Sequence, residues 1–277
     1  FEREIIVSAG SIEAITASLI AIINDKKNEV ILFSPSYASY PEAVKVAGAE
    51  PVFVNLIEEI EADKRGYSSN LEADLRGNYG WRIDFKNLAK KINKRTAAII
   101  LCNPNNPTGM LFPKEDLLRV AKLAWSKKIF IILDEVYKDF IYETRINTDE
   151  NTDKYGYKLF SLAQITELRK IIIRVFSFSK AYAMTGWRIG FIHSDEENIS
   201  EIVKVHDSLV TCAPVISQYA AIGALDFADN EVEKFRQKYQ ERRDLICRHL
   251  DDLKDVFSYQ KPNSSYFVFP KITRINA

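Results

Sequence analysis

The stretch SFSKAYAMTGWRIG, residues Ser177 to Gly190, directly follows the apolar run Ile171–Phe176. That run has the length and composition of a buried strand, and ligands of open α/β sheets bind outside the carboxyl ends of strands. A lysine at such an end is partly desolvated, which frees its amine for Schiff-base chemistry. Lys180 alone is weak evidence, because most lysines are solvated surface groups. Arg188 adds a second cation near the same strand end.

Outward from this strand, short apolar runs alternate with amphipathic helical stretches. The predicted strands are Val30–Phe33, Val52–Val54, Ala98–Leu101, Ile129–Leu133 and Ile171–Phe176. The predicted helices are Ile12–Ile23, Pro41–Ala47, Phe85–Ile92, Lys114–Lys127 and Lys158–Leu168. Apolar runs without alternation are typical of strands buried on both faces of a parallel sheet. The pattern therefore predicts an α/β fold with a doubly wound, mostly parallel sheet.

The pattern changes after Asp195. Three helices are predicted, followed by two strand-like pieces: Glu197–Leu209, Val215–Phe227, Glu231–Leu253, Val256–Tyr259 and Tyr266–Phe269. The last helix is long and densely charged, as expected of a helix that bridges two domains. We therefore predict a large α/β domain over residues 1–240, with residues 241–277 as the start of a smaller α+β domain. Asn55–Asp84 and Glu143–Tyr157 are predicted to be surface loops.

Composition excludes several classes of partner. The 277 residues carry 38 Lys and Arg against 38 Asp and Glu, so no general attraction to nucleic acid or to an anionic membrane is expected. No run of eighteen apolar residues and no leader sequence is visible, which predicts a cytoplasmic protein. The cysteines and histidines show no ligand spacing, so no metal site is predicted.

An acid closes another of the predicted strands. Asp134 directly follows Ile129–Leu133, and a buried carboxylate without a partner would cost several kcal/mol. A protonated pyridine nitrogen would serve as its partner, because a protonated ring stabilises a substrate carbanion. A helix N-cap is the alternative role for this aspartate.

Three further segments place polar or aromatic groups beside predicted elements. Asn106 lies in the turn CNPNNPTG, residues 102–109, after the strand Ala98–Leu101. Tyr37 follows Val30–Phe33 and offers a ring that can stack on a flat molecule. Gly10 and Ser11 precede a predicted helix, whose exposed N–H groups and dipole favour an anion such as phosphate.

Four segments occur in the order seen in class I/II pyridoxal-phosphate-dependent aminotransferases, which are fold type I enzymes of the aspartate aminotransferase superfamily. They are AGSIEA (9–14), NPNNPTG (103–109), DEVY (134–137) and residues 177–190, of which the last is the most specific. The resemblance implies pyridoxal 5'-phosphate as cofactor. It matches Lys180 to the Schiff-base lysine, Asp134 to the partner of the pyridine nitrogen, Asn106 and Tyr137 to the phenolic-oxygen pair, and Tyr37 to the stacking aromatic. Gly10, Ser11, Ser177 and Arg188 match the phosphate-binding residues.

The function implied by this resemblance is transfer of an amino group between an L-amino acid and a 2-oxo acid. Lys180, Asp134 and Tyr137 are the implied catalytic residues, and a homodimer with shared active sites is the implied assembly. The same scaffold supports carbon–sulfur β-lyases, and it also serves as a non-enzymatic ligand-sensing domain in transcription regulators. These two functions remain alternatives.

The sequence also departs from the family pattern. Ser264 and Ser265 stand where Gly and Ala are usual, which predicts a different backbone approach to the substrate. Asn55–Trp81 is longer than is typical. The family has an N-terminal segment and a C-terminal domain with the arginine that binds the substrate's α-carboxylate. We therefore expect the natural polypeptide to extend at both ends and that arginine to lie outside this chain.

Overall fold

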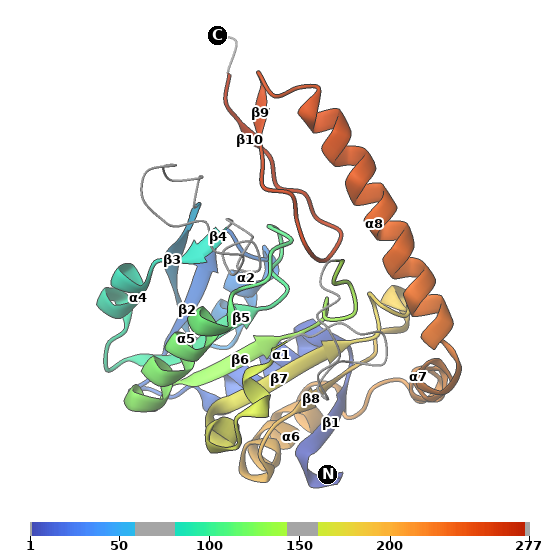
Figure 1. Ribbon diagram of the computed structural model, residues 1–277. Coiled ribbons are helices and arrows are strands. Elements are labelled where there is room, and N and C mark those ends of the chain that lie inside the picture. The colour runs from blue at the N-terminus through green and yellow to red at the C-terminus, as the bar shows by residue number, and fades with distance from the viewer. Residues whose placement is uncertain (1, 59–80, 143–159, 275–277) are drawn as a thin grey trace.

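The computed structural model describes residues 2–58, 81–142 and 160–274, and its centre is a twisted eight-stranded sheet (Figure 1). The strand order across the sheet is β1-β8-β7-β6-β5-β2-β3-β4. The strands are β1 Ile5–Ser8, β2 Glu29–Ser34, β3 Glu50–Glu58, β4 Trp81–Ile83, β5 Thr96–Cys102, β6 Phe130–Asp134, β7 Ile172–Ser177 and β8 Gly190–His193.

The five predicted strands are confirmed as β2, β3, β5, β6 and β7, which run parallel to one another. Three strands were missed: β8 pairs antiparallel with β7, β1 with β8, and β4 with β3. Strands of three or four residues carry too little periodicity to stand out in a sequence. β8 also begins inside the segment that carries Lys180 and Arg188, which reads as a loop.

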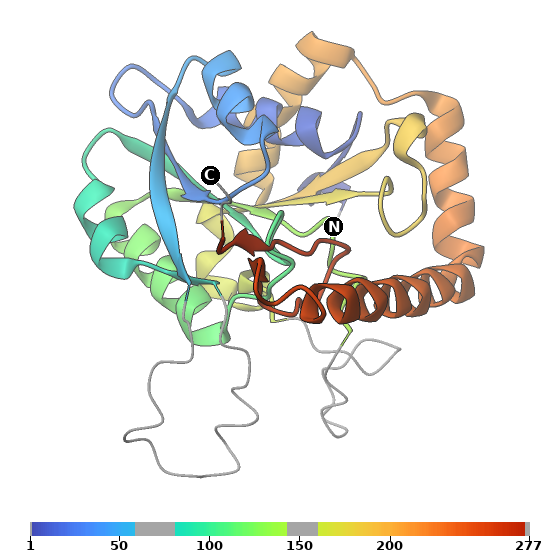
Figure 2. The same ribbon diagram turned by 90° about the horizontal axis from the view of Figure 1, so that it is seen from above.

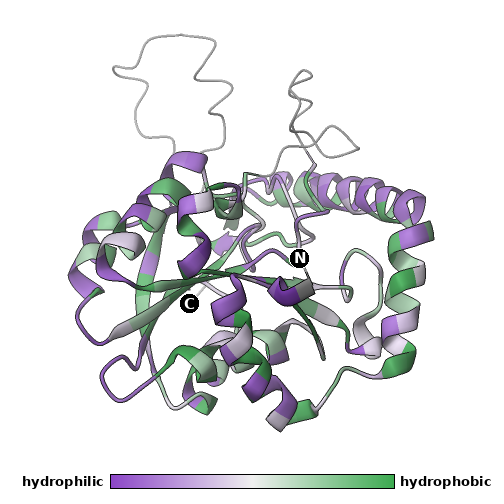
Figure 3. Cartoon of the chain, turned by 90° about the horizontal axis from the view of Figure 1, so that it is seen from below, coloured by the Kyte–Doolittle hydropathy of each residue, from purple (hydrophilic) through white to green (hydrophobic). Residues whose placement is uncertain are grey.

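Helices cover both faces of the sheet. On one side lie α1 Ser11–Ile22, α2 Ser39–Val46 and α6 Glu196–Val210, and on the other α4 Phe85–Lys91 and α5 Lys114–Lys127 (Figure 2). Successive residues of β5 therefore enter different cores: Ala98 and Ile100 pack toward α1, Ile99 and Leu101 toward α5. This two-sided burial explains the apolar runs without alternation. The hydropathy colouring in Figure 3 shows green strands between helices that carry both colours.

The C-terminal part confirms the three predicted helices within two residues at each end, as α6, α7 Val215–Phe227 and α8 Asp229–Asp251. Beyond α8, β9 Phe257–Ser258 pairs with β10 Lys271–Ile272. The strand predicted at Tyr266–Phe269 is wrong, since the pairing lies two residues later. Tyr266 and Phe267 instead turn their rings onto Tyr137, and Ser265 before them has a left-handed φ of 56°.

The α-helix predicted over Lys158–Leu168 is also wrong in the described part, which begins at residue 160. Two short 3₁₀ segments stand there instead, η2 Leu162–Gln164 and η3 Thr166–Ile171. The Ser161 hydroxyl accepts the Ala163 N–H, and Ile165 is extended, so a continuous helix is interrupted.

The two predicted loops fall largely outside the described residues, as does the unusually long part of Asn55–Trp81. The ends of the first are strands, since β3 continues to Glu58 and β4 begins at Trp81. The predicted loop Glu143–Tyr157 is not described. Among the described helices, none combines the length and apolar character needed to cross a membrane.

Candidate functional site

Strand direction brings the predicted site residues to one edge of the sheet. β2, β5, β6 and β7 are parallel, so the segments that follow them, with Tyr37, Asn106, Asp134 and Lys180, leave the sheet at the same edge. β1 is antiparallel to β8, and β8 to β7, so β1 points the same way and delivers Gly10 to this edge. This is the carboxyl edge at which open α/β sheets bind ligands.

Asp134 is a buried acid at this edge, with only 3% of its surface exposed. Its Oδ2 accepts a 2.6 Å hydrogen bond from the Tyr40 hydroxyl, and its Oδ1 accepts the Val136 N–H at 3.2 Å. Burial raises the pKa of Asp134 to about 6, although these two hydrogen bonds act in the opposite direction. The pKa of Asp134 is therefore close to neutral pH, so the charge of a nearby group decides whether this carboxyl group is protonated.

Asn106 and Tyr137 form a buried pair. The Asn106 Nδ2 donates to the Tyr137 hydroxyl at 3.1 Å. Burial raises the pKa of Tyr137 well above its ordinary value, so the phenol stays protonated at neutral pH. The rings of Tyr266 and Phe267 meet the Tyr137 ring edge-on at 5.6 and 5.3 Å between centroids. This packing holds the Tyr137 ring in place and so fixes the orientation of its hydroxyl group.

Lys180 lies over the same aromatic group. Its Nζ is 5.8 Å from the centre of the Tyr137 ring and 5.6 Å from that of Tyr266. Its positive charge lowers the pKa of Asp134, so the amine lies within electrostatic reach of this carboxyl group. A partly buried amine close to a buried acid is the pairing expected of a chemical centre rather than of a surface lysine.

The Arg188 guanidinium lies against Gly10 at the start of α1. Gly10 has a φ of 90°, and a Cβ there would come within 2.4 Å of the Arg188 Nη2. Arg188 donates from Nη1 to the Thr185 carbonyl and from Nη2 to the Ala9 carbonyl. No side chain caps the start of α1 at Gly10, so the first N–H groups of the helix, beginning at Ser11, have no side-chain acceptor at the cap. A helix start with a guanidinium beside it suits an anion.

Two predicted residues have looser surroundings. The Ser177 hydroxyl accepts the Ser179 N–H at 3.1 Å, which ties the turn before Lys180. The Tyr37 ring is 38% exposed and meets the Tyr40 ring edge-on, with 5.5 Å between centroids. Both lie at the carboxyl edge of the sheet.

Three contacts of this edge were not predicted. Tyr40 is the partner of Asp134, and it lies three residues after Tyr37, at the start of α2. Glu13 accepts the Ala9 N–H at 3.0 Å, and its carboxylate lies 3.0 Å from Nδ1 of buried His206. Glu13 stands three residues after the N-cap Gly10, as in a capping box, but the N-cap is not Ser or Thr, so the sequence signal for this contact is incomplete.

The segment Pro262–Phe267 closes the site from the C-terminal side. Ser264 and Ser265 are completely buried. The Ser264 hydroxyl donates to the Gly109 carbonyl at 2.8 Å, and the Ser265 N–H donates to the Phe140 carbonyl at 2.7 Å. The two serines therefore fasten this segment to the loops that follow β5 and β6.

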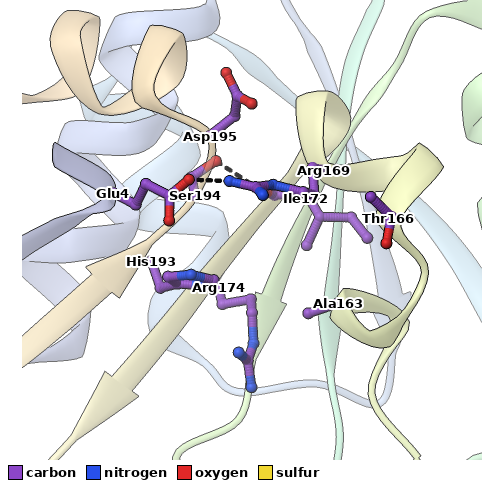
Figure 4. A pocket seen from close by; sticks show the side chains of 9 residues that line it. All are labelled: Glu4, Ala163, Thr166, Arg169, Ile172, Arg174, His193, Ser194 and Asp195. Atoms are coloured by element: carbon purple, nitrogen blue, oxygen red, sulfur yellow. Dashed lines mark hydrogen bonds and ion pairs between the residues drawn. The ribbon is translucent and has the colours of Figure 1, made fainter. Parts of the chain in front are cut away.

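A separate hollow of about 340 Å³ lies at the other end of β7, beside η3 and the end of β8 (Figure 4). Its two arginines already have acidic partners, because Arg169 pairs with Glu4 and Arg174 pairs with Glu135 at 2.8 Å. Burial, followed by these two cations, lowers the pKa of His193 in its wall. None of the predicted site residues lines this hollow.

Comparison with known proteins agrees with the geometry. The family described as Aminotransferase class I and II matches residues 1–276. An aspartate aminotransferase of Sulfolobus acidocaldarius is 29% identical over 99% of this chain and 60% of its own length. An aromatic-amino-acid aminotransferase of Thermococcus litoralis is 31% identical over 98% of this chain and 61% of its own length.

Solved structures show the same fold. An aromatic aminotransferase from Pyrococcus horikoshii superposes with a TM-score of 0.80 at 32% identity, over 97% of this chain and 64% of that one. The aspartate aminotransferase of Thermus thermophilus with maleate gives 0.79 at 29% identity, over 97% and 61%. The chain therefore spans about 60% of the length of the curated relatives that it matches.

Proposed function

Because the chain belongs to the class I and II aminotransferase family, we propose that it carries the cofactor site of a transaminase. The reaction moves an amino group between an L-amino acid and a 2-oxo acid. The observation that supports this most directly is a buried acid and an amine at the ends of neighbouring strands, Asp134 after β6 and Lys180 after β7. Such chemistry needs an electron-withdrawing ring and a base. The cofactor would supply the ring, Asp134 would favour its protonated state, and the Lys180 amine would supply the base.

Family members use pyridoxal phosphate, and the residues at the carboxyl edge fit it. The start of α1 suits the phosphate, because it places the Arg188 guanidinium beside a helix start without a side-chain cap. The buried Asp134 suits a protonated ring nitrogen, which would supply the charge that the carboxylate needs. Every residue proposed to hold the cofactor lies between Gly10 and Arg188.

When bound, pyridoxal phosphate supplies an aldehyde that condenses with amines and a ring that accepts electrons from the substrate Cα. Asp134 would hold the proton on the pyridine nitrogen. Asn106 and Tyr137 would hydrogen-bond the phenolic oxygen, and Tyr37 would pack against the ring. The Lys180 amine would hold the cofactor covalently and, when free, would move a proton from the substrate Cα.

The test of the function uses the full natural polypeptide with pyridoxal phosphate. Each amino acid is offered with and without a 2-oxo acid, and the new amino acid and new oxo acid are measured. Production of both, strictly dependent on the oxo acid, supports the transaminase. Release of pyruvate from cysteine-like substrates without an oxo acid would instead identify a carbon–sulfur lyase, and binding without turnover would favour a ligand sensor.

We also propose a homodimer with shared active sites. The surface that supports it is α7, where large apolar side chains are exposed along most of the helix: Val215, Ile216, Tyr219, Ile222, Leu225 and Phe227. Exposed apolar patches of this kind mark contact surfaces. A second copy of the chain is the occupant expected from the family resemblance.

Two further proposals concern location and domains. The three cysteines, Cys102, Cys212 and Cys247, are free thiols, which suits the reducing cytoplasm. The proposed division into residues 1–240 and 241–277 falls inside α8, which continues without a break from Asp229 to Asp251. α8 would then link the two parts as a rigid arm. Cell fractionation tests the location, and hydrogen exchange tests whether the two parts unfold separately.

A further inference from the structure

We propose that Tyr40 is a positioning residue for the cofactor site, whose hydroxyl keeps the Asp134 carboxylate ionised and fixed in orientation. The inference rests on the proposed function, because it concerns the acid that would hold the cofactor's ring nitrogen. It adds a residue that reaches the cofactor only through another side chain.

The geometry of the contact is tight. Tyr40, on α2, is 2% exposed, and its hydroxyl lies 2.6 Å from Asp134 Oδ2. Its ring sits in the core between α1, α2 and the sheet, with the Tyr37 ring edge-on to it. A buried ring in a packed core cannot swing away, so the hydroxyl is held toward the carboxylate. The backbone N–H of Val136 holds the other oxygen.

Tyr40 is the donor of this bond. Burial, reinforced by the nearby acid, raises the pKa of Tyr40 well above its ordinary value, so the phenol keeps its proton across the physiological range. Burial also raises the pKa of Asp134 to about 6, and the Tyr40 hydrogen bond is the largest influence that opposes this rise. The hydroxyl therefore favours the charged form of the acid.

Few of the side chains around Asp134 can favour its ionised form. The titratable ones that influence it are Tyr40 from α2, Cys102 from β5, Glu135 and Tyr137 after β6, and Lys180 after β7. Burial raises the pKa of the Cys102 thiol, and burial likewise keeps Tyr137 neutral, so neither adds a charge near pH 7. Glu135 opposes ionisation of Asp134 and is itself paired with Arg174.

The consequence appears near neutral pH. With a pKa of about 6, Asp134 is mostly ionised at pH 7.5 and can keep a proton on a ring nitrogen. Loss of a hydrogen bond to a charged group is expected to raise that pKa by about one unit. A larger share of the acid would then be neutral, and a neutral acid does not stabilise a protonated ring.

The decisive measurement is a carboxyl ¹³C NMR titration of the cofactor-free chain labelled at aspartate, with Asp134→Asn used to assign the resonance. In Tyr40→Phe the pKa of Asp134 should rise by about one unit. At pH 6, where Asp134 would be about half ionised in the wild type and about one tenth ionised in the variant, the dissociation constant of pyridoxal phosphate should rise about fivefold. It should approach the wild-type value above about pH 8.5, where Asp134 is ionised in both proteins.

Tyr259→Phe is the matched control. It removes another tyrosine hydroxyl that donates to an aspartate, Asp251 at 2.7 Å, which lies on α8 and not on a strand of the sheet. It should leave both the Asp134 pKa and cofactor binding unchanged. Should Tyr40→Phe fail to fold, 3,5-difluorotyrosine at position 40 provides the second test, because a more acidic phenol donates more strongly and should lower the Asp134 pKa.

An Asp134 pKa that stays within about 0.2 units of wild type in both variants overturns the proposal, a limit set well inside the one-unit shift expected. That outcome is distinct from failure of the proposed function. If the wild-type chain does not bind pyridoxal phosphate, the function fails, whereas the titration still reports whether Tyr40 controls Asp134.

Discussion

Asp134 shows how a single residue takes its chemistry from its surroundings. At the end of β6 its carboxylate is buried, hydrogen-bonded on both oxygens and within the influence of the Lys180 charge. Neither of the two sequence interpretations, helix cap or partner of a ring nitrogen, required Tyr40. No helix begins directly after Asp134 in the described structure, and its Oδ1 bond to the Val136 N–H belongs to a turn.

Lys180 should be the residue that binds the cofactor covalently. Borohydride reduction of the protein with pyridoxal phosphate should place the label on the peptide that contains Lys180, because no other proposed site residue is an amine. Lys180→Ala should abolish turnover and still bind cofactor through the phosphate and ring contacts. A label on a different lysine in the peptide map would contradict the assignment.

Asp134→Asn should lower turnover and raise the free energy of unfolding. A pKa of about 6 in the folded chain, against 3.8 as its ordinary value, means that the folded state binds this proton more tightly than the unfolded state. The free energy of unfolding of the wild type is therefore expected to fall as pH rises from about 4 to 6 and to level off above. Two pKa units correspond to about 3 kcal/mol.

Urea unfolding of the cofactor-free proteins checks this expectation. Asp134→Asn should match the wild type at pH 4 and exceed its stability by up to about 3 kcal/mol at pH 7.5. Its turnover should fall about a hundredfold, since a strong electrostatic contact is lost. Equal stability at pH 7.5 would show that burial of this charge is not costly.

At the scale of elements, the start of α1 and the loop before β8 work as one unit. The guanidinium of Arg188 lies so close to Gly10 that no side chain fits there. Arg188 and its hydrogen-bond partner Ala9 are 179 residues apart in the sequence. Strand pairing of β1 with β8 brings them together, because Ser8 is opposite Gly190 in the register.

Gly10→Ala should therefore weaken cofactor binding. The added Cβ would lie 2.4 Å from the Arg188 Nη2 and would force the guanidinium to move, and alanine is strained at a φ of 90°. We expect a loss of about tenfold or more in affinity for pyridoxal phosphate, as for one charge-assisted contact. Fluorescence titration measures it.

Gly48→Ala is the control for the backbone effect. Gly48 also has a positive φ, 78°, but nothing lies within 4 Å of the position of a Cβ. It should cost about 1 kcal/mol of stability and leave cofactor affinity unchanged. Equal losses of affinity in the two variants would mean that strain, rather than the displacement of Arg188, explains the effect.

At the scale of the whole molecule, α7 stands apart from the two helical layers. Helices α1, α2, α4, α5 and α6 each pack apolar side chains against the sheet, whereas most of the large apolar side chains of α7 are exposed. Exposed apolar side chains are unfavourable in water, and association with another surface would bury them.

Ile216→Asp should therefore disrupt self-association. Ile216 is 69% exposed on α7, and a charge at a subunit contact would be buried without a partner. Light scattering after gel filtration should show a dimer for wild type and a dissociation constant raised at least about tenfold for the variant. Val46→Asp, at an equally exposed position on α2, should remain dimeric. A wild type that is monomeric at micromolar concentration would refute the proposed dimer.

The sequence by itself determined the class of fold, because the apolar runs β2, β3, β5, β6 and β7 could only be buried from both sides. It also determined which residues end those strands, and hence that Lys180, Asp134 and Asn106 share an edge. Helices α5 and α7 follow from apolar periodicity and begin and end at the predicted residues.

Only the tertiary structure decided what completes these residues. The contacts of Tyr40 with Asp134, of Arg188 with Ala9 and of Ser264 with Gly109 join positions that are 94, 179 and 155 residues apart. Local periodicity carries no information at such separations, and β1, β4 and β8 are too short to show any. The same holds for Tyr266, whose aromatic character suggested a strand until packing against Tyr137 turned it inward. Local preference forms elements, but the geometry of a site depends on which distant elements pack together.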